Sequence, residues 1–262
     1  MDFQLSGRTV LVTGASNGVG LATARMLLAE GANVGVCARD GDRLAAAFTD
    51  LGLEARSRLL QRTCDVLDAG AVGELITGLV GEFGGVDGVV NNAGGSLMRP
   101  PLETTDEQWV DQMRLKVLSV LNTVRAALPW LRKASGASVV NVNAILARQP
   151  EVRLAATSAA RAALLNLSTS LANELAVDRV RVNSVCLGLI DTGQWRRRYE
   201  TSGSPSDFAS WTAELAADRG IALGRFGEAD EVAFPIVSLL SPRSSYVTGA
   251  TLDVGGGVAR YV

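Results

Sequence analysis

The sequence predicts one α/β domain whose core is a doubly wound parallel sheet of about seven strands, with helices on both faces. Short runs rich in Val, Ile and Leu alternate with longer helical patterns along most of the 262 residues, and this alternation is typical of parallel sheets. Parallel strands need crossover connections, which the intervening helices supply. No proline-rich linker, internal repeat or block of like charge divides the chain, so we expect a single domain over residues 1–262.

The expected elements follow from these patterns in chain order. The helix that starts at residue 106 has a capping-box spacing, because Thr105 can cap it and Gln108 follows three residues later. The helix that starts at residue 154 is apolar over much of its circumference, which favours burial between identical subunits over a deep monomer core. We therefore expect a homo-oligomer. Strands are expected at residues 9–13, 33–38, 58–64, 86–90, 138–143, 180–186 and 250–254, and helices at 19–30, 42–52, 69–82, 106–131, 154–176 and 228–240.

The segment 187–223 differs from the rest of the chain because it is long and mixed in polarity. It carries three consecutive arginines followed by Tyr199. Connections of this length inside a compact domain are usually functional lids or disordered. Trp195 and Trp211 indicate that part of the segment folds against an apolar surface, so we expect a substrate lid.

Composition narrows the possible partners and chemistries. With 25 basic and 27 acidic residues the net charge is −2, so neither nucleic acid nor a membrane surface is an expected partner. No apolar run reaches the roughly 18 residues of a spanning helix. The beginning of the chain lacks the pattern of a signal peptide, and the three cysteines are far apart, so a cytoplasmic protein with reduced thiols is expected. The absence of histidine excludes a histidine-based triad and paired-histidine zinc motifs, and no metal is expected.

A glycine-rich stretch near the start of the chain predicts a phosphate-binding loop. It follows an apolar, β-branched run and precedes a helical pattern rich in alanine and leucine. Gly14 permits a tight turn at the end of the strand. Gly18 lets the backbone approach a phosphate closely, and Gly20 lets the helix pack near the strand. The free N–H groups at the start of the helix then face the anion.

Five stretches in this order resemble motifs of the short-chain dehydrogenase/reductase family, and the resemblance spans nearly the whole chain. They lie at residues 13–20, 65–66, 91–94, 181–192 and 248–257. The resemblance implies a Rossmann-type fold, a nicotinamide dinucleotide, a small-molecule substrate and a dimer or tetramer. The cofactor contacts that it implies are Gly14, Ser16, Asn17, Gly18, Val19, Gly20, Arg39, Asp65, Val66, Asn91, Ala93, Gly94, Ile190 and Thr192.

The end of the second expected strand favours NADP(H) over NAD(H). Family members that prefer NAD commonly place an acidic residue there to bind the ribose hydroxyls. This chain has Ala38 followed by Arg39. An arginine offers a 2′-phosphate a bidentate, charge-assisted partner, whereas a carboxylate would repel it.

The resemblance fails at the four catalytic positions of the family. The family uses an asparagine, a serine, a tyrosine and a lysine, and this chain has Arg114, Ala144, Thr157 and Arg161 at those positions. A threonine hydroxyl cannot be tuned to the acidity that a tyrosine offers near a cation. Ordinary interconversion of an alcohol and a ketone by the family mechanism is therefore not expected. Tyr199 is a possible substitute proton source, although a structural role in the lid or on the surface is the simpler interpretation.

Three functions remain open at this stage. The chain is an oxidoreductase with an altered proton source, a non-redox enzyme on the same scaffold (a cyclase, isomerase or dehydratase), or a catalytically silent cofactor-binding or partner subunit. Arg114, Arg153 and Arg161 together would make the pocket cationic, which suits an anionic small-molecule ligand.

Overall fold

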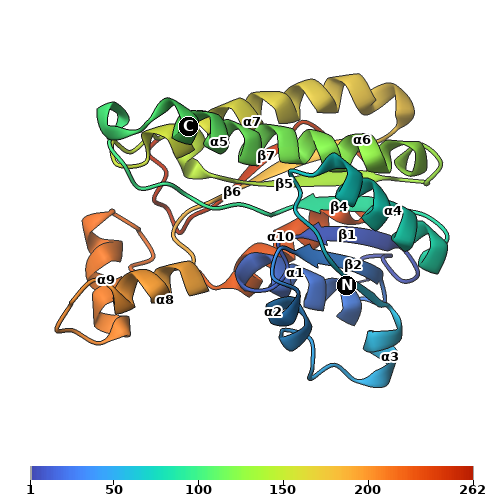
Figure 1. Cartoon of the computed structure of the whole chain (residues 1–262), viewed down its shortest axis with the longest axis horizontal. Helices are drawn as coiled ribbons and strands as arrows, with labels where there is room; N and C mark the ends of the chain where they lie inside the picture. The colour runs from blue at the N-terminus through green and yellow to red at the C-terminus, as the bar shows by residue number, and fades with distance from the viewer. Residues whose placement is uncertain (1, 262) are drawn as a thin grey trace.

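The computed structural model, which describes residues 2–261, contains one seven-stranded parallel sheet with the order β3-β2-β1-β4-β5-β6-β7 (Figure 1). The strand order reverses between β1 and β4, and in such sheets ligands bind in the crevice beyond the carboxyl ends of the strands at this point. The strands are β1 (Thr9–Thr13), β2 (Asn33–Ala38), β3 (Leu59–Thr63), β4 (Gly88–Asn91), β5 (Ser138–Ala144), β6 (Arg181–Leu187) and β7 (Thr251–Val254).

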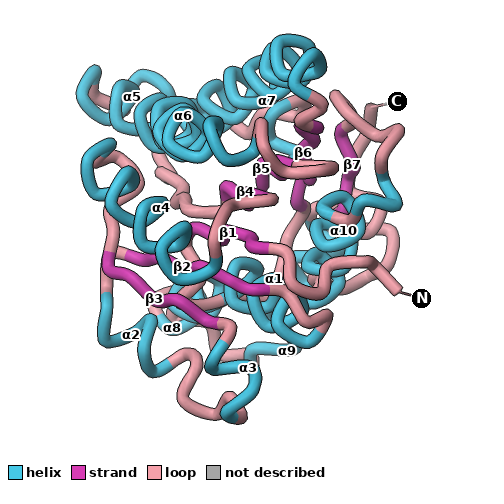
Figure 2. Tube along the Cα trace, turned by 90° about the vertical axis from the view of Figure 1, so that its right-hand side faces the viewer, coloured by secondary structure: helices cyan, strands magenta, loops and turns pink. Residues whose placement is uncertain are grey.

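The helices form two layers, one on each face of the sheet. In Figures 1 and 2, α4, α6 and α7 lie on one side and α1 and α10 on the other. The helices are α1 (Gly18–Ala29), α2 (Gly41–Ala46), α3 (Leu53–Ser57), α4 (Ala69–Phe83), α5 (Asp106–Met113), α6 (Ser119–Leu131), α7 (Ala155–Leu175), α8 (Gly193–Glu200), α9 (Phe208–Asp218) and α10 (Ala229–Leu240), with a π-helical segment η2 (Arg114–Leu118) and short 3₁₀ turns η1 (Pro101–Glu103), η3 (Ile145–Ala147), η4 (Ala176–Asp178) and η5 (Pro242–Ser244).

Alternate residues of the central strands are buried in two separate cores. Leu11 and Val89 belong to the core under α4, α6 and α7, whereas Val10, Val12 and Val90 belong to the core under α1 and α10. Successive strand residues point to opposite faces, and both faces are covered by helices. This explains why the strands are continuous apolar runs rather than alternating apolar and polar patterns.

The chain between β2 and β3 differs from the prediction of one helix at 42–52. The helix α2 ends at Ala46, and a second short helix, α3, begins after Gly52. Gly52 adopts an extended backbone conformation (φ −65°, ψ 162°), which interrupts the helix. Glycine is a poor helix former, so its position favours a break. The expected strand at 58–64 is slightly shorter, because Arg58 ends α3.

The predicted helix at 106–131 starts as expected but is not continuous. The capping box is present, since Gln108 N donates to Thr105 Oγ1 and Thr105 N donates to Gln108 Oε1. The π-helical segment η2 then separates α5 from α6. A π-helical turn inserts one residue into a helix and changes which side chains face inward, and it occurs frequently at functional sites.

The segment 188–227 folds as two helices, α8 and α9, beyond the carboxyl edge of the sheet (Figure 1). Aromatic rings join the two helices: Trp195 lies 6.2 Å from Trp211, and Tyr199 lies 5.5 Å from Trp211 and 5.4 Å from Phe208 between ring centroids. The expectation that the tryptophans fold against an apolar surface is confirmed, because Trp195 also packs edge-on against Phe226.

Candidate functional site

A cavity of about 1140 Å³ lies at the carboxyl edge of the sheet. The loops after β1, β2, β3, β4 and β6 and the end of β5 line it on one side, and α8 and α9 line it on the other. It occupies the crevice where the strand order reverses, which is where a doubly wound sheet binds its ligand.

The glycine loop is held tightly against the loop after β4. Gly14 has a φ of +68°, and a Cβ atom there would lie 2.8 Å from Ala93 Cα. The Asn92 side-chain amide donates to the carbonyl oxygens of Thr13 and Gly14, both at 3.0 Å. Gly18 also has a positive φ, +55°. The local backbone therefore requires glycine. Asn92 is a positioning residue that belongs to the predicted motif at 91–94 but was not predicted as a site residue.

Most of the predicted cofactor contacts come together around this cavity, but two do not line it. A Cβ atom at Gly20 would collide with Asn92 and Gly14, so Gly20 serves the packing of α1. The Asn91 amide donates to Asn141 Oδ1 at 2.8 Å, and its oxygen accepts from Thr123 Oγ1, so this side chain is used within the sheet core. The predicted residues that line the cavity are Gly14, Ser16, Asn17, Gly18, Val19, Arg39, Asp65, Val66, Ala93, Gly94, Ile190 and Thr192.

Two arginines border the cavity at the end of β2. Arg39 is exposed there, and Arg43, which the sequence analysis did not single out, also lines the cavity. The nearby carboxylate of Asp40 caps α2 by accepting a 2.9 Å hydrogen bond from Arg43 N. Arg39 and Arg43 thus bring two guanidinium groups, which suit a phosphate group, to this border, and the Asp40 carboxylate lines it as well.

The four positions that the sequence analysis aligned with the family's catalytic residues do not all line the cavity. Ala144 and Arg161 line the cavity. Thr157 is fully buried outside it: its hydroxyl accepts from Leu97 N at 3.0 Å and donates to Gln112 Oε1 at 2.9 Å. Thr157 thus fixes the loop after β4 to α5 and α7.

The expectation that Arg114 helps to make the pocket cationic is wrong, because its side chain is exposed and does not line the cavity. Arg114 begins the π-helical segment, and the residue of this segment that points inward is Lys116. Arg153 is exposed at the rim, where it does line the cavity.

Lys116 is the buried amine of the site and was missed by sequence reasoning. It is only 3% exposed, lines the cavity, and donates from Nζ to the Gly95 carbonyl oxygen at 2.5 Å. Burial lowers the pKa of Lys116 to about 7, and the nearby positive charge of Arg161 adds to the effect. An amine with such a pKa can both give and take a proton at neutral pH. The inward position of Lys116 could have been predicted from the sequence only if the π-helical turn had been predicted first.

Arg161 is the second cation on this wall. Its Nε is buried without a hydrogen-bond partner among residues 2–261. Burial lowers the pKa of Arg161 to about 10, so the guanidinium stays charged at neutral pH. It is therefore a donor for an anionic or hydroxyl-bearing ligand and not a proton carrier.

The hydroxyl of Tyr199 is used inside the segment that contains α8 and α9. It donates to the Ser206 carbonyl oxygen at 2.8 Å, and Tyr199 does not line the cavity. This geometry does not support the idea of Tyr199 as a substitute proton source. Gln194 and Arg198 connect this segment to the loop after β4, because they donate to Ser96 Oγ at 2.6 and 3.2 Å.

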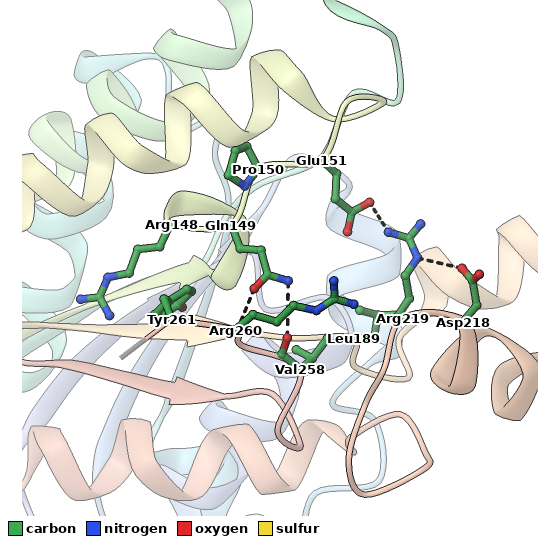
Figure 3. Close-up of a pocket in the computed structure, with 10 residues that line it drawn as sticks. All are labelled: Arg148, Gln149, Pro150, Glu151, Leu189, Asp218, Arg219, Val258, Arg260 and Tyr261. Atoms are coloured by element: carbon green, nitrogen blue, oxygen red, sulfur yellow. Dashed lines mark hydrogen bonds and ion pairs between the residues drawn. The ribbon is translucent and has the colours of Figure 1, made fainter.

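A second cavity of about 580 Å³ adjoins the first (Figure 3). Figure 3 shows Arg219, at the end of α9, reaching to both Glu151 and Asp218. Gln149 closes another part of this region, since its side chain binds Val258 O and Arg260 N. Glu151 and Arg219 line both cavities, so their ion pair stands between them.

Among residues 2–261, no helix is both long and apolar enough to cross a bilayer. Within the same residues, no three side chains of the types that commonly bind metals are grouped together.

Known proteins resemble this chain over nearly its whole length. A family model described as enoyl-(acyl carrier protein) reductase matches residues 14–259. A short-chain oxidoreductase from Pseudomonas aeruginosa PAO1 that contains an atypical catalytic centre has been solved in apo and NADPH-bound forms; these are 45% and 46% identical, with a TM-score of 0.93, and each match covers 98% of this chain and 99% of that one.

Two other proteins extend the comparison to defined activities. L-sorbose reductase from Gluconobacter frateurii, solved with NADPH and L-sorbose, is 31% identical with a TM-score of 0.94 and 100% coverage of both chains. Cis-4-hydroxycyclohexanecarboxylate dehydrogenase from Sinomonas cyclohexanicum is 36% identical, covering 95% of this chain and 96% of its own length. The family match, these relatives and the seven-stranded fold agree with one another, and the chain belongs to the short-chain dehydrogenase/reductase family.

Proposed function

We propose that this chain is an NADP(H)-dependent oxidoreductase of a small carbonyl compound or alcohol, in which Lys116 replaces the family's tyrosine as the proton donor and acceptor. The observation that carries the proposal is the position of Lys116. Its amine lies in the cavity beside Arg161, whereas the hydroxyl at the tyrosine position, Thr157, is buried in the packing behind it.

The residues present fit a nicotinamide dinucleotide phosphate. The positive φ of Gly14 and Gly18 leaves a cradle without side chains at the start of α1, where backbone N–H groups face an anion. Arg39 and Arg43 would hold a 2′-phosphate, and Asp40 is already engaged as a helix cap. The NADPH-bound forms of the Pseudomonas and Gluconobacter relatives support this assignment.

Lys116, Arg161 and Ala144 have separate roles in the rest of the reaction. When bound, the nicotinamide cofactor supplies hydride to a carbonyl carbon in the direction of reduction. The Lys116 ammonium gives a proton from Nζ to the carbonyl oxygen, becomes a neutral amine, and regains a proton from water. In the oxidative direction the neutral amine takes the hydroxyl proton. Arg161 remains charged and holds neighbouring oxygens in place, and Ala144 leaves room beside them.

The test measures cofactor binding and turnover separately. NADPH and NADH are titrated calorimetrically, and NADPH consumption is then followed at 340 nm in stopped flow with a panel of ketones, aldehydes and oxo acids. Lys116→Met should keep NADPH affinity and lose about 10²- to 10⁴-fold in turnover, the usual contribution of a positioned acid. Lys133→Met, at an exposed lysine of the same chain, is the matched control and should leave both values unchanged.

Two results would contradict the proposal. NADPH binding with no turnover on any member of the panel would leave a non-redox enzyme or a cofactor-binding partner subunit. Turnover that survives Lys116→Met would assign the proton to another group.

We also infer a homo-oligomer, because three apolar side chains of the α5–η2 region are exposed. Val110, Met113 and Leu118 are 48%, 40% and 45% exposed in the single chain. Apolar groups gathered in this way mark interaction surfaces. Sedimentation velocity should show a dimer or tetramer, and a monomer at all concentrations would refute this inference.

A further inference from the structure

The arginines of the segment that contains α8 and α9 differ in how their charge is balanced. Arg196 forms a 2.7 Å ion pair with Asp191. Arg219 pairs with Glu151 and Asp218 (Figure 3). Arg197 and Arg198, by contrast, form no ion pair with any carboxylate among residues 2–261. Both line the cavity, but Arg197 is exposed whereas Arg198 is partly buried. Glu151 raises the pKa of Arg198 without pairing with it, and Arg219, which holds that carboxylate, acts in the opposite direction. A partly buried guanidinium with no carboxylate in contact is costly unless a ligand supplies one.

The Arg198 side chain is held in a defined position inside the cavity. Its Cζ atom lies 4.5 Å from the ring centroid of Trp195, and Nη2 donates to Ser96 Oγ at 3.2 Å. Burial is the main cause that lowers the pKa of Arg198. Stacking and one hydrogen bond leave the other N–H donors of the guanidinium fork for a further partner.

The Ser96 hydroxyl extends this set of donors. Its oxygen accepts from both Gln194 and Arg198, and its own proton has no acceptor among residues 2–261. Ser96 and Arg198 therefore both present hydrogen-bond donors to the same part of the cavity. Nearby, Lys116 and Arg161 add positive charge, while the carboxylate of Glu151 is already paired with Arg219. The arrangement suits an anion with two acceptor oxygens.

We propose that Arg198 and Ser96 bind a carboxylate of the substrate, so that the enzyme acts on a small oxo acid or, in the reverse direction, a hydroxy acid. This substrate class rests on the proposed function, because it assumes that the substrate carbonyl lies at Lys116. The carboxylate anchor itself does not depend on turnover.

The loop after β4 places the anchor close to the reacting group. Lys116 contacts the carbonyl of Gly95, and Arg198 contacts the side chain of the next residue, Ser96. Consecutive Cα atoms are about 3.8 Å apart, so the carboxylate and the carbonyl of one compact molecule can meet both groups. Trp211 and Leu215 line the same cavity and offer an apolar surface to the body of the ligand.

The test compares a carboxylate with a neutral molecule of the same shape. Cyclohexanecarboxylate and cyclohexanecarboxamide are titrated calorimetrically into the full-length protein, with and without NADPH. The wild-type protein should prefer the carboxylate about ten- to a hundredfold, the range expected for hydrogen bonds to a charged group. Arg198→Gln should reduce this preference to less than about threefold, and Arg198→Lys, which keeps the charge without the fork, should retain part of it.

Arg196→Gln is the matched control, since it removes the same charge from the same helix at a residue outside the cavity lining. It should keep the full preference. Equal affinity of the wild-type protein for the two probes would overturn the anchor, and this comparison needs no variant. A preference that survives Arg198→Gln, with circular dichroism showing a folded protein, would also overturn it. An Arg198-dependent preference in a protein that turns over no oxo acid would support the anchor and refute only the proposed reaction.

Discussion

Replacing Lys116 with methionine should stabilise the folded protein at neutral pH while it removes the proposed proton donor. The lysine amine is 3% exposed and makes one hydrogen bond, to the Gly95 carbonyl. Its ordinary pKa of 10.5 is lowered to about 7 because burial penalises the charged form. Methionine has a similar length and no charge, so the variant avoids that penalty.

The size of this stabilisation follows from the difference between the ordinary pKa of lysine and the lowered pKa of Lys116. About 3.5 pH units at roughly 1.4 kcal/mol each give a cost of about 5 kcal/mol for keeping a charged Lys116 in the fold below pH 7. Losing the hydrogen bond to Gly95 offsets about 1–3 kcal/mol of the gain. The variant should therefore be more stable by roughly 2–4 kcal/mol at about pH 6.

The difference in unfolding free energy between Lys116→Met and the wild-type protein should depend on pH in a characteristic way. Between about pH 7 and 10.5 the unfolded chain binds more protons at Lys116 than the folded chain does. Wild-type stability therefore gains up to about 1.4 kcal/mol per pH unit from this group as the pH rises through that window. The variant lacks this contribution, so its advantage should shrink across the window and be constant below it.

Urea unfolding followed by circular dichroism, at fixed protein concentration without cofactor, measures this difference from about pH 6 to about pH 10. Other titrating groups are common to both proteins and cancel in the difference. Lys133→Met, at the exposed lysine, is the control for the loss of a lysine side chain from the surface. A Lys116→Met difference that does not change with pH would refute the lowered pKa of Lys116, and with it the argument for a proton donor at neutral pH.

Four further outcomes are expected. Arg39→Asp should raise the Kd for NADPH at least tenfold while it spares or improves NADH binding, because a carboxylate repels the 2′-phosphate; unchanged selectivity in paired titrations would contradict the cofactor assignment. Gly18→Val should weaken NADPH binding at least tenfold, because φ is +55° there and a β-branched side chain would fill the phosphate cradle; calorimetry checks this, and an unchanged affinity would place the diphosphate elsewhere. Thr157→Val should lower the free energy of unfolding by about 1–3 kcal/mol by leaving the Leu97 N–H without its acceptor, yet keep NADPH affinity; a large loss of turnover at unchanged stability would show that this hydroxyl acts in the chemistry. Reduction of a carbonyl should slow as the pH rises above about 7, since the acid form of Lys116 is then depleted; a rate constant that stays level up to pH 9 would exclude this amine as the donor.

The sequence by itself determined the doubly wound sheet and the phosphate-binding loop. Both depend on local patterns: β-branched runs bounded by turns make buried strands, and Gly14 and Gly18 are needed where the backbone takes a positive φ. Arg39 could be assigned to the end of β2 because it directly follows the strand. The resemblance to the family also predicts, from the sequence alone, that the four usual catalytic side chains are absent.

Only the tertiary structure decided which cationic groups reach the cavity. The π-helical turn brings Lys116 inward and leaves Arg114 in solvent, and no local pattern in the sequence predicted that turn. The pKa of Lys116 falls because distant segments bury the amine. Arg198 is one of three consecutive arginines that the sequence does not distinguish. Packing on Trp195 and a hydrogen bond to Ser96 separate it from its neighbours. The hydrogen bond could not be predicted, because Ser96 lies about a hundred positions away in the sequence.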